Sequence, residues 1–243
     1  MPPLLELDRV TKRYGGLHAL RQVSFAVEER ALVALLGPNG AGKTTVFDIT
    51  SGLVRPTAGT VRFEGTSLVG LSPHRIAALG IGRTFQIARL FPALPVLDNV
   101  LVGVTFGRRR RRGADARRHA ERLLEVVGLH DKAATPARAL SLGEQKRLEL
   151  ACALGPEPRL LLLDELASGL PPRGRQEVVR FYGRLRERGL TVIAIEHSFS
   201  VLLEVADRVL LLDQGELMAD GPTREVLASP QVAQAYFGEE DGE

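Results

Sequence analysis

The chain has 243 residues, with 32 Lys and Arg against 29 Asp and Glu, so its formal net charge is only +3. This mild imbalance does not indicate a nucleic-acid-binding surface. The single cysteine, Cys152, excludes a disulfide within the chain and favours a reducing compartment, and its apolar helical surroundings predict a place in the core. A chain of this length can bury a large core, and we expect a larger lobe with a smaller one attached. No apolar run has the length that spans a bilayer, so we expect a cytosolic, soluble protein.

Two runs near the N-terminus alternate between apolar and polar residues, which predicts an antiparallel layer leading into a core strand. Their apolar residues are Leu5, Leu7 and Val10, then Val23, Phe25 and Val27. Tyr14 stands at the end of the first run. A ring placed upstream of a phosphate loop can stack on an adenine face, whereas a lone tyrosine at a strand end is more often simple edge packing.

The segment from Gly37 to Thr45 has the spacing G-x-x-x-x-G-K-T of a phosphate-binding loop. A buried strand is predicted over 31–36 and a helix over 44–53, which is the strand–loop–helix context that the loop requires. Glycines allow the tight turn that aims backbone N–H groups and a helix N-terminus at one anion. The candidate phosphate-binding residues are Gly37, Pro38, Asn39, Gly40, Ala41, Gly42, Lys43, Thr44 and Thr45.

Beyond the loop, a short strand is predicted over 60–63, a helix over 73–78, and a strand from Ile81 that runs toward Gln86. Gln86 by itself is compatible with an ordinary polar strand end. From Leu97 to about Gly155 the patterns are helical, so a helical lobe interrupts the sheet. Its run of five arginines, Arg108 to Arg112, is usually a solvated loop or helix start, and the alternative is contact with a membrane surface or a partner.

Ser141 and Glu144 have the spacing of a capping box, which predicts a helix start. Because a serine and the glycine Gly143 at a helix N-terminus can also bind an anion, this segment is a second candidate anion site.

The apolar run from Leu160 ends in Asp164 and Glu165, and a further buried strand over 191–195 ends before His197. The carboxyl ends of parallel strands bind ligands in α/β sheets, so Asp164 is a candidate Mg²⁺ ligand through water. His197 at the same edge is as compatible with a structural role as with a functional one. A further strand over 208–213 is followed by a hairpin turn at 214–215, and two short helices are expected after that turn.

Together these motifs resemble ABC transporter ATPase subunits over nearly the whole chain. The resemblance implies an α/β P-loop NTPase with a mainly parallel core sheet, an antiparallel β layer and an inserted helical subdomain. The expected division is a RecA-like core over 1–86 and 156–243, with the helical signature subdomain over about 87–155. Tyr14 matches the aromatic residue that stacks on adenine in this family, Gly37 to Thr45 match the Walker A loop, and Gln86 matches the Q-loop glutamine. Leu140 to Gln145 match the signature motif, and Leu160 to Asp164 match Walker B. Glu165 matches the general base, Ser168 to Leu170 match the D-loop, and His197 matches the switch histidine.

The resemblance implies two ATP molecules sandwiched in a dimer, with the signature serine of one subunit capping the phosphate held by the other. ATP and Mg²⁺ are the expected cofactors. Glu165, His197 and Gln86 are the expected catalytic residues, and Thr44, Gln86 and Asp164 the expected metal ligands. Nucleotide contacts are expected from Tyr14, from Gly37 to Thr45, and from Ser141, Gly143 and Glu144.

Three segments are similar to the ATPase subunits of branched-chain amino-acid importers, namely 12–17, 82–91 and 235–240. This similarity implies permease subunits, a second ATPase subunit and a periplasmic or extracellular binding protein as partners, no nucleic acid, and a peripheral place on the cytoplasmic face of the inner membrane. Related ATPases serve lipopolysaccharide export, which stays an alternative.

Three residues depart from the family pattern. Leu142 replaces a signature glycine, Leu166 a proline, and Pro171 a polar D-loop residue that hydrogen-bonds across the dimer. The last change predicts slow turnover or a heterodimer.

Two rival classes remain to be weighed. A GTPase or small-molecule kinase shares the phosphate loop, but neither Asn39 nor Asn99 begins an N-K-x-D motif. A soluble ABC ATPase acting on nucleic acid or ribosomes tends to have two cassettes or a long coiled-coil insertion, and this chain has neither.

Overall fold

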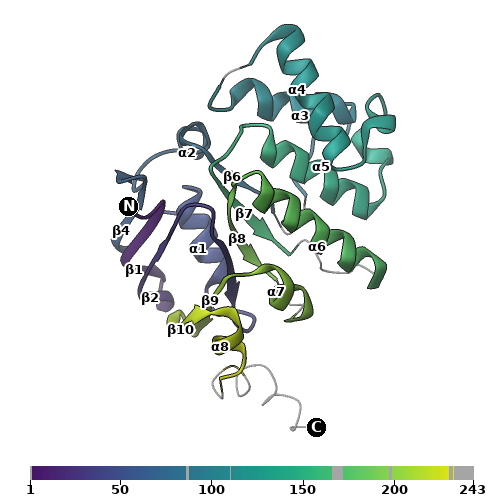
Figure 1. The fold of residues 1–243 in the computed structure, drawn as a ribbon. Coiled ribbons are helices and arrows are strands. Elements are labelled where there is room, and N and C mark those ends of the chain that lie inside the picture. The colour runs from purple at the N-terminus through teal and green to yellow at the C-terminus, as the bar shows by residue number, and fades with distance from the viewer. Residues whose placement is uncertain are drawn as a thin grey trace. The chain divides into compact units, whose positions relative to one another are not determined.

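The computed structural model, drawn in Figure 1, describes residues 2–85, 88–109, 111–165, 172–196, 199–229 and 232. The chain divides into two units. The first unit is formed by Met1–Pro73 and Ala167–Glu243, and the second by His74–Leu166. Within the described ranges, no helix combines the length and the apolar character needed to cross a membrane.

An antiparallel sheet in the first unit has the strand order β2-β1-β4-β5. Its strands are β1 (Leu5–Tyr14), β2 (Leu17–Val27), β4 (Ala58–Phe63) and β5 (Thr66–Ser67). Leu5 pairs with Val27 and Leu7 with Phe25, and all four side chains are buried. Since alternate residues of a strand point to the same face, this register buries one face of the layer, which confirms the prediction from the period-two pattern.

A second set of strands in this unit has the order β10-β9-β3-β8. The strands are β3 (Leu32–Leu36), β8 (Thr191–Ile195), β9 (Arg208–Asp213) and β10 (Glu216–Pro222). β3 runs parallel to both β8 and β9, and all five of its residues are buried, as expected of a parallel strand covered on both faces. β9 and β10 form an antiparallel hairpin, which confirms the predicted turn at 214–215. The prediction of helix directly after this turn is wrong for 216–222, which pair with β9 as β10. The helices of this unit are α1 (Lys43–Thr50), α6 (Pro172–Glu187), α7 (Phe199–Val205) and α8 (Thr223–Leu227).

The second unit contains the parallel pair β6 (Ile81–Arg83) and β7 (Leu160–Asp164) and the whole stretch predicted to be helical. Its helices are α2 (Pro73–Leu79), α3 (Val96–Phe106), α4 (Gly113–Val126) and α5 (Leu142–Leu154), with short 3₁₀ turns at His130–Lys132 and Ala137–Ala139. The prediction of helices between 97 and 155 is confirmed.

Cys152 lies where α3 packs closely against α5. A Cβ atom added to Gly103 on α3 would lie 2.6 Å from the carbonyl oxygen of Cys152, so the two backbones approach directly. The predicted buried face of α5 is Leu148, Ala151 and Leu154, all buried. Cys152 lies one step around the helix from that face: the residue as a whole is partly exposed, while burial raises the pKa of its thiol to about 12.

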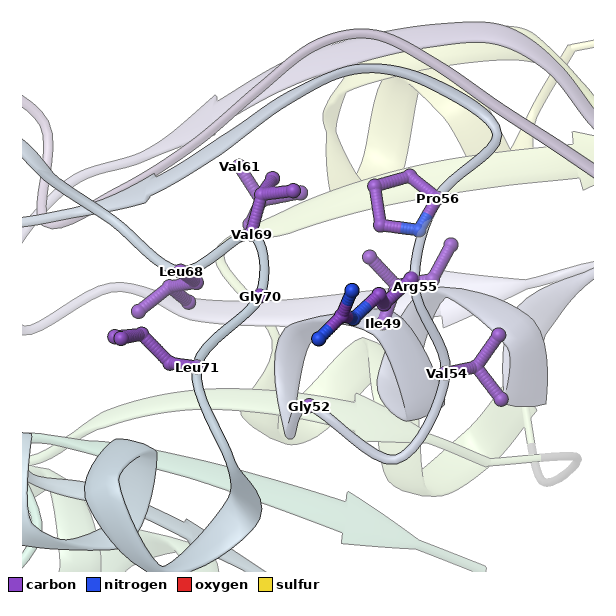
Figure 2. A pocket seen from close by; sticks show the side chains of 10 residues that line it. All are labelled: Ile49, Gly52, Val54, Arg55, Pro56, Val61, Leu68, Val69, Gly70 and Leu71. Atoms are coloured by element: carbon purple, nitrogen blue, oxygen red, sulfur yellow. The ribbon is translucent and has the colours of Figure 1, made fainter.

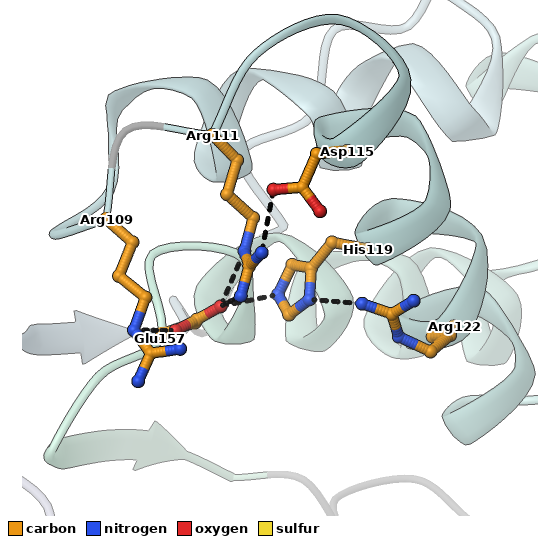
Figure 3. A network of polar contacts seen from close by, with 6 residues as sticks. All are labelled: Arg109, Arg111, Asp115, His119, Arg122 and Glu157. Atoms are coloured by element: carbon orange, nitrogen blue, oxygen red, sulfur yellow. Dashed lines mark hydrogen bonds and ion pairs between the residues drawn. The ribbon is translucent and has the colours of Figure 1, made fainter.

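Part of the arginine run is held inside the second unit by Glu157, in the turn before β7 (Figure 3). Arg109 Nε lies 2.9 Å from Glu157 Oε2, and Arg111 Nε donates to Glu157 Oε1 at 2.8 Å. Arg111 also pairs with Asp115 on α4 at 2.7 Å. These two arginines therefore tie the start of α4 to the chain that enters β7, a structural role that neither sequence interpretation included.

Candidate nucleotide-binding site

The glycines of the predicted phosphate loop are required by backbone geometry. Gly37, Gly40 and Gly42 have φ values of 148°, 82° and 104°, a region that favours glycine. A Cβ atom on Gly37 would lie 2.1 Å from the carbonyl oxygen of Leu212, and one on Gly42 would lie 2.6 Å from that of Ala19. A Cβ atom added to Gly40 would meet no atom within 4 Å, so glycine is favoured at this position only by its φ value. The loop is thus packed on β9 and β2 with no room for side chains at two positions.

Lys43 and the N-terminus of α1 supply positive charge at this loop. The Lys43 side chain is buried, and its Nζ donates to the carbonyls of Gly37 at 2.5 Å and Pro38 at 2.8 Å. α1 begins at Lys43, and no side chain caps its N-terminus. The N–H groups of a first helical turn have no intrahelical partner, and the helix dipole favours an anion there. The loop therefore fits a phosphate group, and the exposed Thr44 fits a hydrated cation beside it.

The β9–β10 turn braces the phosphate loop, a contact that the sequence interpretation missed. The N–H of Gly215 donates to the carbonyl of Ala41 at 3.1 Å, and its own carbonyl accepts from Arg21 N at 2.8 Å. Gly215 has φ 81°, and an added Cβ would lie 2.7 Å from the carbonyl oxygen of Ala19. The turn itself was predictable from Gln214-Gly215, but its partner lies far away in the sequence.

Tyr14 lies beside the first turn of α1. Its side chain hydrogen-bonds to that of Thr45, and Lys12 Nζ lies 4.8 Å from the ring centroid. Partial burial and the nearby Asp48 carboxylate raise the pKa of the Tyr14 phenol, which the Thr45 bond opposes. The ring is still 45% exposed, so it offers surface next to the phosphate loop. Stacking on adenine stays a prediction.

The signature segment of the second unit forms the predicted capping box at the start of α5. Glu144 Oε2 accepts from Ser141 N at 2.9 Å and from Ser141 Oγ at 3.0 Å, while Oε1 accepts from Lys132 Nζ at 2.5 Å. The Lys132 bond, followed by those from Ser141, lowers the pKa of Glu144 to about 2. A Cβ on Gly143 would meet no atom within 4 Å, and Leu142 is 72% exposed, so the helix start presents an open surface.

The two acids predicted at the end of β7 are found there. Asp164 is buried, and its N–H donates to Thr84 Oγ1 at 3.0 Å. Glu165 follows with φ 53°, a left-handed conformation that is uncommon outside glycine and concentrates at functional sites. Its carbonyl accepts from Lys146 Nζ of α5 at 3.2 Å. The backbone thus turns sharply between the two carboxylates.

Several predicted residues lie outside the described residues. They are Gln86, Leu166, the D-loop residues Ser168 to Leu170, Pro171 and His197. The structure brings Tyr14 and the phosphate loop together in the first unit, and Asp164, Glu165 and α5 in the second.

A hollow near the other end of α1 holds none of the predicted site residues (Figure 2). Apolar side chains such as Ile49, Val61 and Leu68 line it together with Arg55. It has room for little more than a water molecule. The hollow is therefore not the nucleotide site.

Comparisons with known proteins agree with the motifs. The family model described as ABC transporter matches residues 20–168. The high-affinity branched-chain amino acid transport ATP-binding protein BraF of Pseudomonas aeruginosa is 38% identical, and LivG of Escherichia coli K12 is 36% identical; each match covers 98% of this chain and 98% of the relative.

Among solved structures, the ADP conformation of MJ1267, an ATP-binding cassette of an ABC transporter, has a TM-score of 0.87 and 26% identity over 98% of this chain and 100% of its own. The dimeric post-hydrolysis structure of the cassette MJ0796 bound to ADP and Pi has a TM-score of 0.81 and 28% identity over 90% and 99% of the two chains. These likenesses confirm the predicted fold class. The chain belongs to the ABC transporter family.

Proposed function

We propose that the chain is the ATP-binding and ATP-hydrolysing subunit of a membrane transporter that imports branched-chain amino acids. The observation that carries ATP binding is the phosphate loop, whose glycines have positive φ, whose Lys43 ammonium is buried within it, and whose helix N-terminus has no side-chain cap. The substrate is inferred from the relatives, which are described as branched-chain amino acid transport proteins. These names favour transport of branched-chain amino acids over lipopolysaccharide export and over action on nucleic acid.

In the nucleotide complex, Lys43 and the first-turn N–H groups of α1 bind the β- and γ-phosphates. Tyr14 stacks on the adenine. Thr44, Asp164 and Gln86 hold Mg²⁺, which when bound neutralises charge on the phosphates. Asp164 fits this role because it is a buried carboxylate at the carboxyl end of a parallel strand.

A dimer completes the site, because the signature segment acts on the nucleotide of the partner subunit. Ser141 and Gly143 at the N-terminus of α5, aligned by Glu144, contact the γ-phosphate there. A family member of similar fold, MJ0796, has been solved as a dimer, which supports this arrangement. The functional division into a core over 1–86 and 156–243 and a signature subdomain over about 87–155 stays a prediction, as does the identity of the second ATPase subunit.

Glu165 is the proposed general base. It orients the attacking water and takes its proton, while His197 holds the γ-phosphate and water in place. Glu165→Gln keeps the shape of the side chain but cannot accept the proton. We expect ATP binding to survive and hydrolysis to fall by at least about 10²-fold, the lower end of general-base contributions.

The matched control is Lys43→Ala, which should abolish ATP binding as well as hydrolysis because it removes the cation of the loop. Phosphate release and nucleotide titration separate the two variants, and size-exclusion chromatography with Mg-ATP tests for a stable dimer of the Glu165→Gln protein. Near-normal turnover in Glu165→Gln would show that Glu165 is not the base.

The substrate and the partners can be identified only with the assembled transporter. We place the chain peripherally on the cytoplasmic face of the membrane, bound to permease subunits that receive substrate from a binding protein. Purifying the native membrane complex and identifying the co-purifying proteins tests this, and ATPase stimulation by leucine, isoleucine or valine with the binding protein tests the substrate. Co-purification of lipopolysaccharide-export components would refute import. Co-purification of ribosomes, with a binding affinity that falls steeply as the salt concentration rises, would refute it as well.

A further inference from the structure

Glu149 is a buried carboxylate to which the proposed nucleotide contacts give no role. It lies on α5 and is only 5% exposed. Its Oε1 atom accepts hydrogen bonds from the backbone N–H groups of Phe85 at 2.9 Å and Arg89 at 3.3 Å. Burial raises the pKa of this carboxyl, Asp164 adds to the rise, and the two N–H groups oppose it. A buried carboxylate is costly unless it is hydrogen-bonded, and so is a buried N–H group. Moving α5 away from Phe85 and Arg89 would therefore leave polar groups on both sides unpaired.

The segment that receives these bonds is further held by its own side chains. Thr84, fully buried, joins the end of β7 through its bond with Asp164 N. The guanidinium carbons of Arg83 and Arg89 lie 4.8 and 4.2 Å from the centroid of the Phe85 ring, within the range of cation–π attraction. The residues described on the two sides of position 86 are therefore fixed to one another, to β7 and to α5.

Lys146 gives the same helix a second contact. It lies three residues before Glu149, on the same face of α5, because residues three apart in an α-helix are neighbours. Its Nζ donates to the carbonyl of Glu165 at 3.2 Å. One face of α5 thus holds the backbone of the proposed base and the backbone around position 86, while its N-terminus carries the signature segment.

We propose that Glu149 is a positioning residue that, as a hydrogen-bond acceptor, couples the signature helix to the backbone on both sides of Gln86. When Ser141 engages the nucleotide of the partner subunit, a displacement of α5 carries Phe85 and Arg89 with it, because breaking these bonds leaves buried groups unpaired. Lys146 carries the same displacement to Glu165. The inference rests on the proposed function for the roles of Gln86 and Glu165.

Three variants of the full chain test this acceptor role. Glu149→Ala removes the acceptor, Glu149→Gln keeps a carbonyl oxygen in its place, and Glu125→Ala is the matched control, because Glu125 is an exposed glutamate on α4. We expect Glu149→Ala to lower kcat by about tenfold while KM for ATP stays within about twofold. Glu149→Gln should restore most of kcat, and Glu125→Ala should match the wild type.

A second measurement needs no ATP. Hydrogen exchange of the Phe85 and Arg89 amides should speed up by about tenfold in Glu149→Ala relative to the other two variants, since these amides lose their acceptor. Unchanged exchange there, unchanged kcat, or a Glu149→Gln protein as impaired as Glu149→Ala would each overturn the proposal. A wild-type protein that hydrolyses no ATP would refute the proposed function alone, and the exchange result would still decide whether Glu149 holds this segment.

Discussion

The buried pair of Tyr182 and Glu196 leads to a prediction that can be worked out from the structure. Tyr182 on α6 is fully buried, Glu196 at the end of β8 is 2% exposed, and the phenol donates to Glu196 Oε1 at 3.0 Å. Burial, followed by the charge of Glu196, raises the pKa of Tyr182 well above its usual value, so the phenol keeps its proton and stays a donor. The bond therefore joins α6 to the strand end just before His197.

Tyr182→Phe removes only the hydroxyl group. The phenylalanine ring keeps the packing, including the contact with Phe181 at 6.4 Å between ring centroids, so the expected loss is that of the hydrogen bond. A bond to a charged group contributes about 1.5–3 kcal/mol, and no water can replace this donor at a buried site. For a chain of this size each kcal/mol shifts Tm by about 2–4 °C, so we expect Tm to fall by about 3–12 °C.

Thermal unfolding without nucleotide measures this change, and Tyr14→Phe is the control. Tyr14 loses the same hydroxyl, but its ring is 45% exposed and water can replace the bond to Thr45. We therefore expect a loss below about 1 kcal/mol for the control. A Tyr182→Phe protein that unfolds within about 1 °C of the wild type, or together with the control, would refute the reasoning.

The remaining predictions concern single side chains. Tyr14→Ala should weaken ATP binding by about 1–3 kcal/mol, the range for stacking of a base on an aromatic ring, and unchanged affinity in a titration would remove that assignment. Burial raises the pKa of the Cys152 thiol to about 12, so iodoacetamide at pH 8 should modify the native protein about a thousandfold more slowly than the urea-unfolded protein, and equal rates would contradict the burial. The pKa of Glu144 is lowered to about 2 mainly by Lys132, so Lys132→Ala should raise it toward 4.5 in an NMR titration. Because a lowered carboxyl pKa stabilises the fold above the unfolded-state value, Lys132→Ala should destabilise the protein above about pH 5, and the difference should vanish as the pH falls toward 2.

The arginine run shows where sequence interpretation stopped. A run of like charges is usually solvated, and its composition cannot reveal a single buried partner. The structure pairs Arg109 and Arg111 with Glu157, which stands 46 positions from Arg111 in the chain. Two arginines of the run are therefore already paired within the protein, which leaves fewer of them to contact a membrane surface or a partner. Arg110 lies outside the described residues.

The sequence by itself determined the elements whose geometry is local. The phosphate loop, the capping box of Ser141 and Glu144, and the strand that ends at Asp164 follow from the spacing of neighbouring residues, because turn conformation, helix capping and strand period are set within a few positions. The family motifs then implied their roles.

Only the tertiary structure decided which distant groups meet. Glu149 reads as an ordinary helical glutamate, yet it binds the N–H of Phe85, 64 positions away. Gly215 reads as a hairpin glycine, yet its N–H holds Ala41 of the phosphate loop. Such contacts depend on how strands and helices pack, and the packing arises from buried surfaces gathered along the whole chain, so no local pattern contains them.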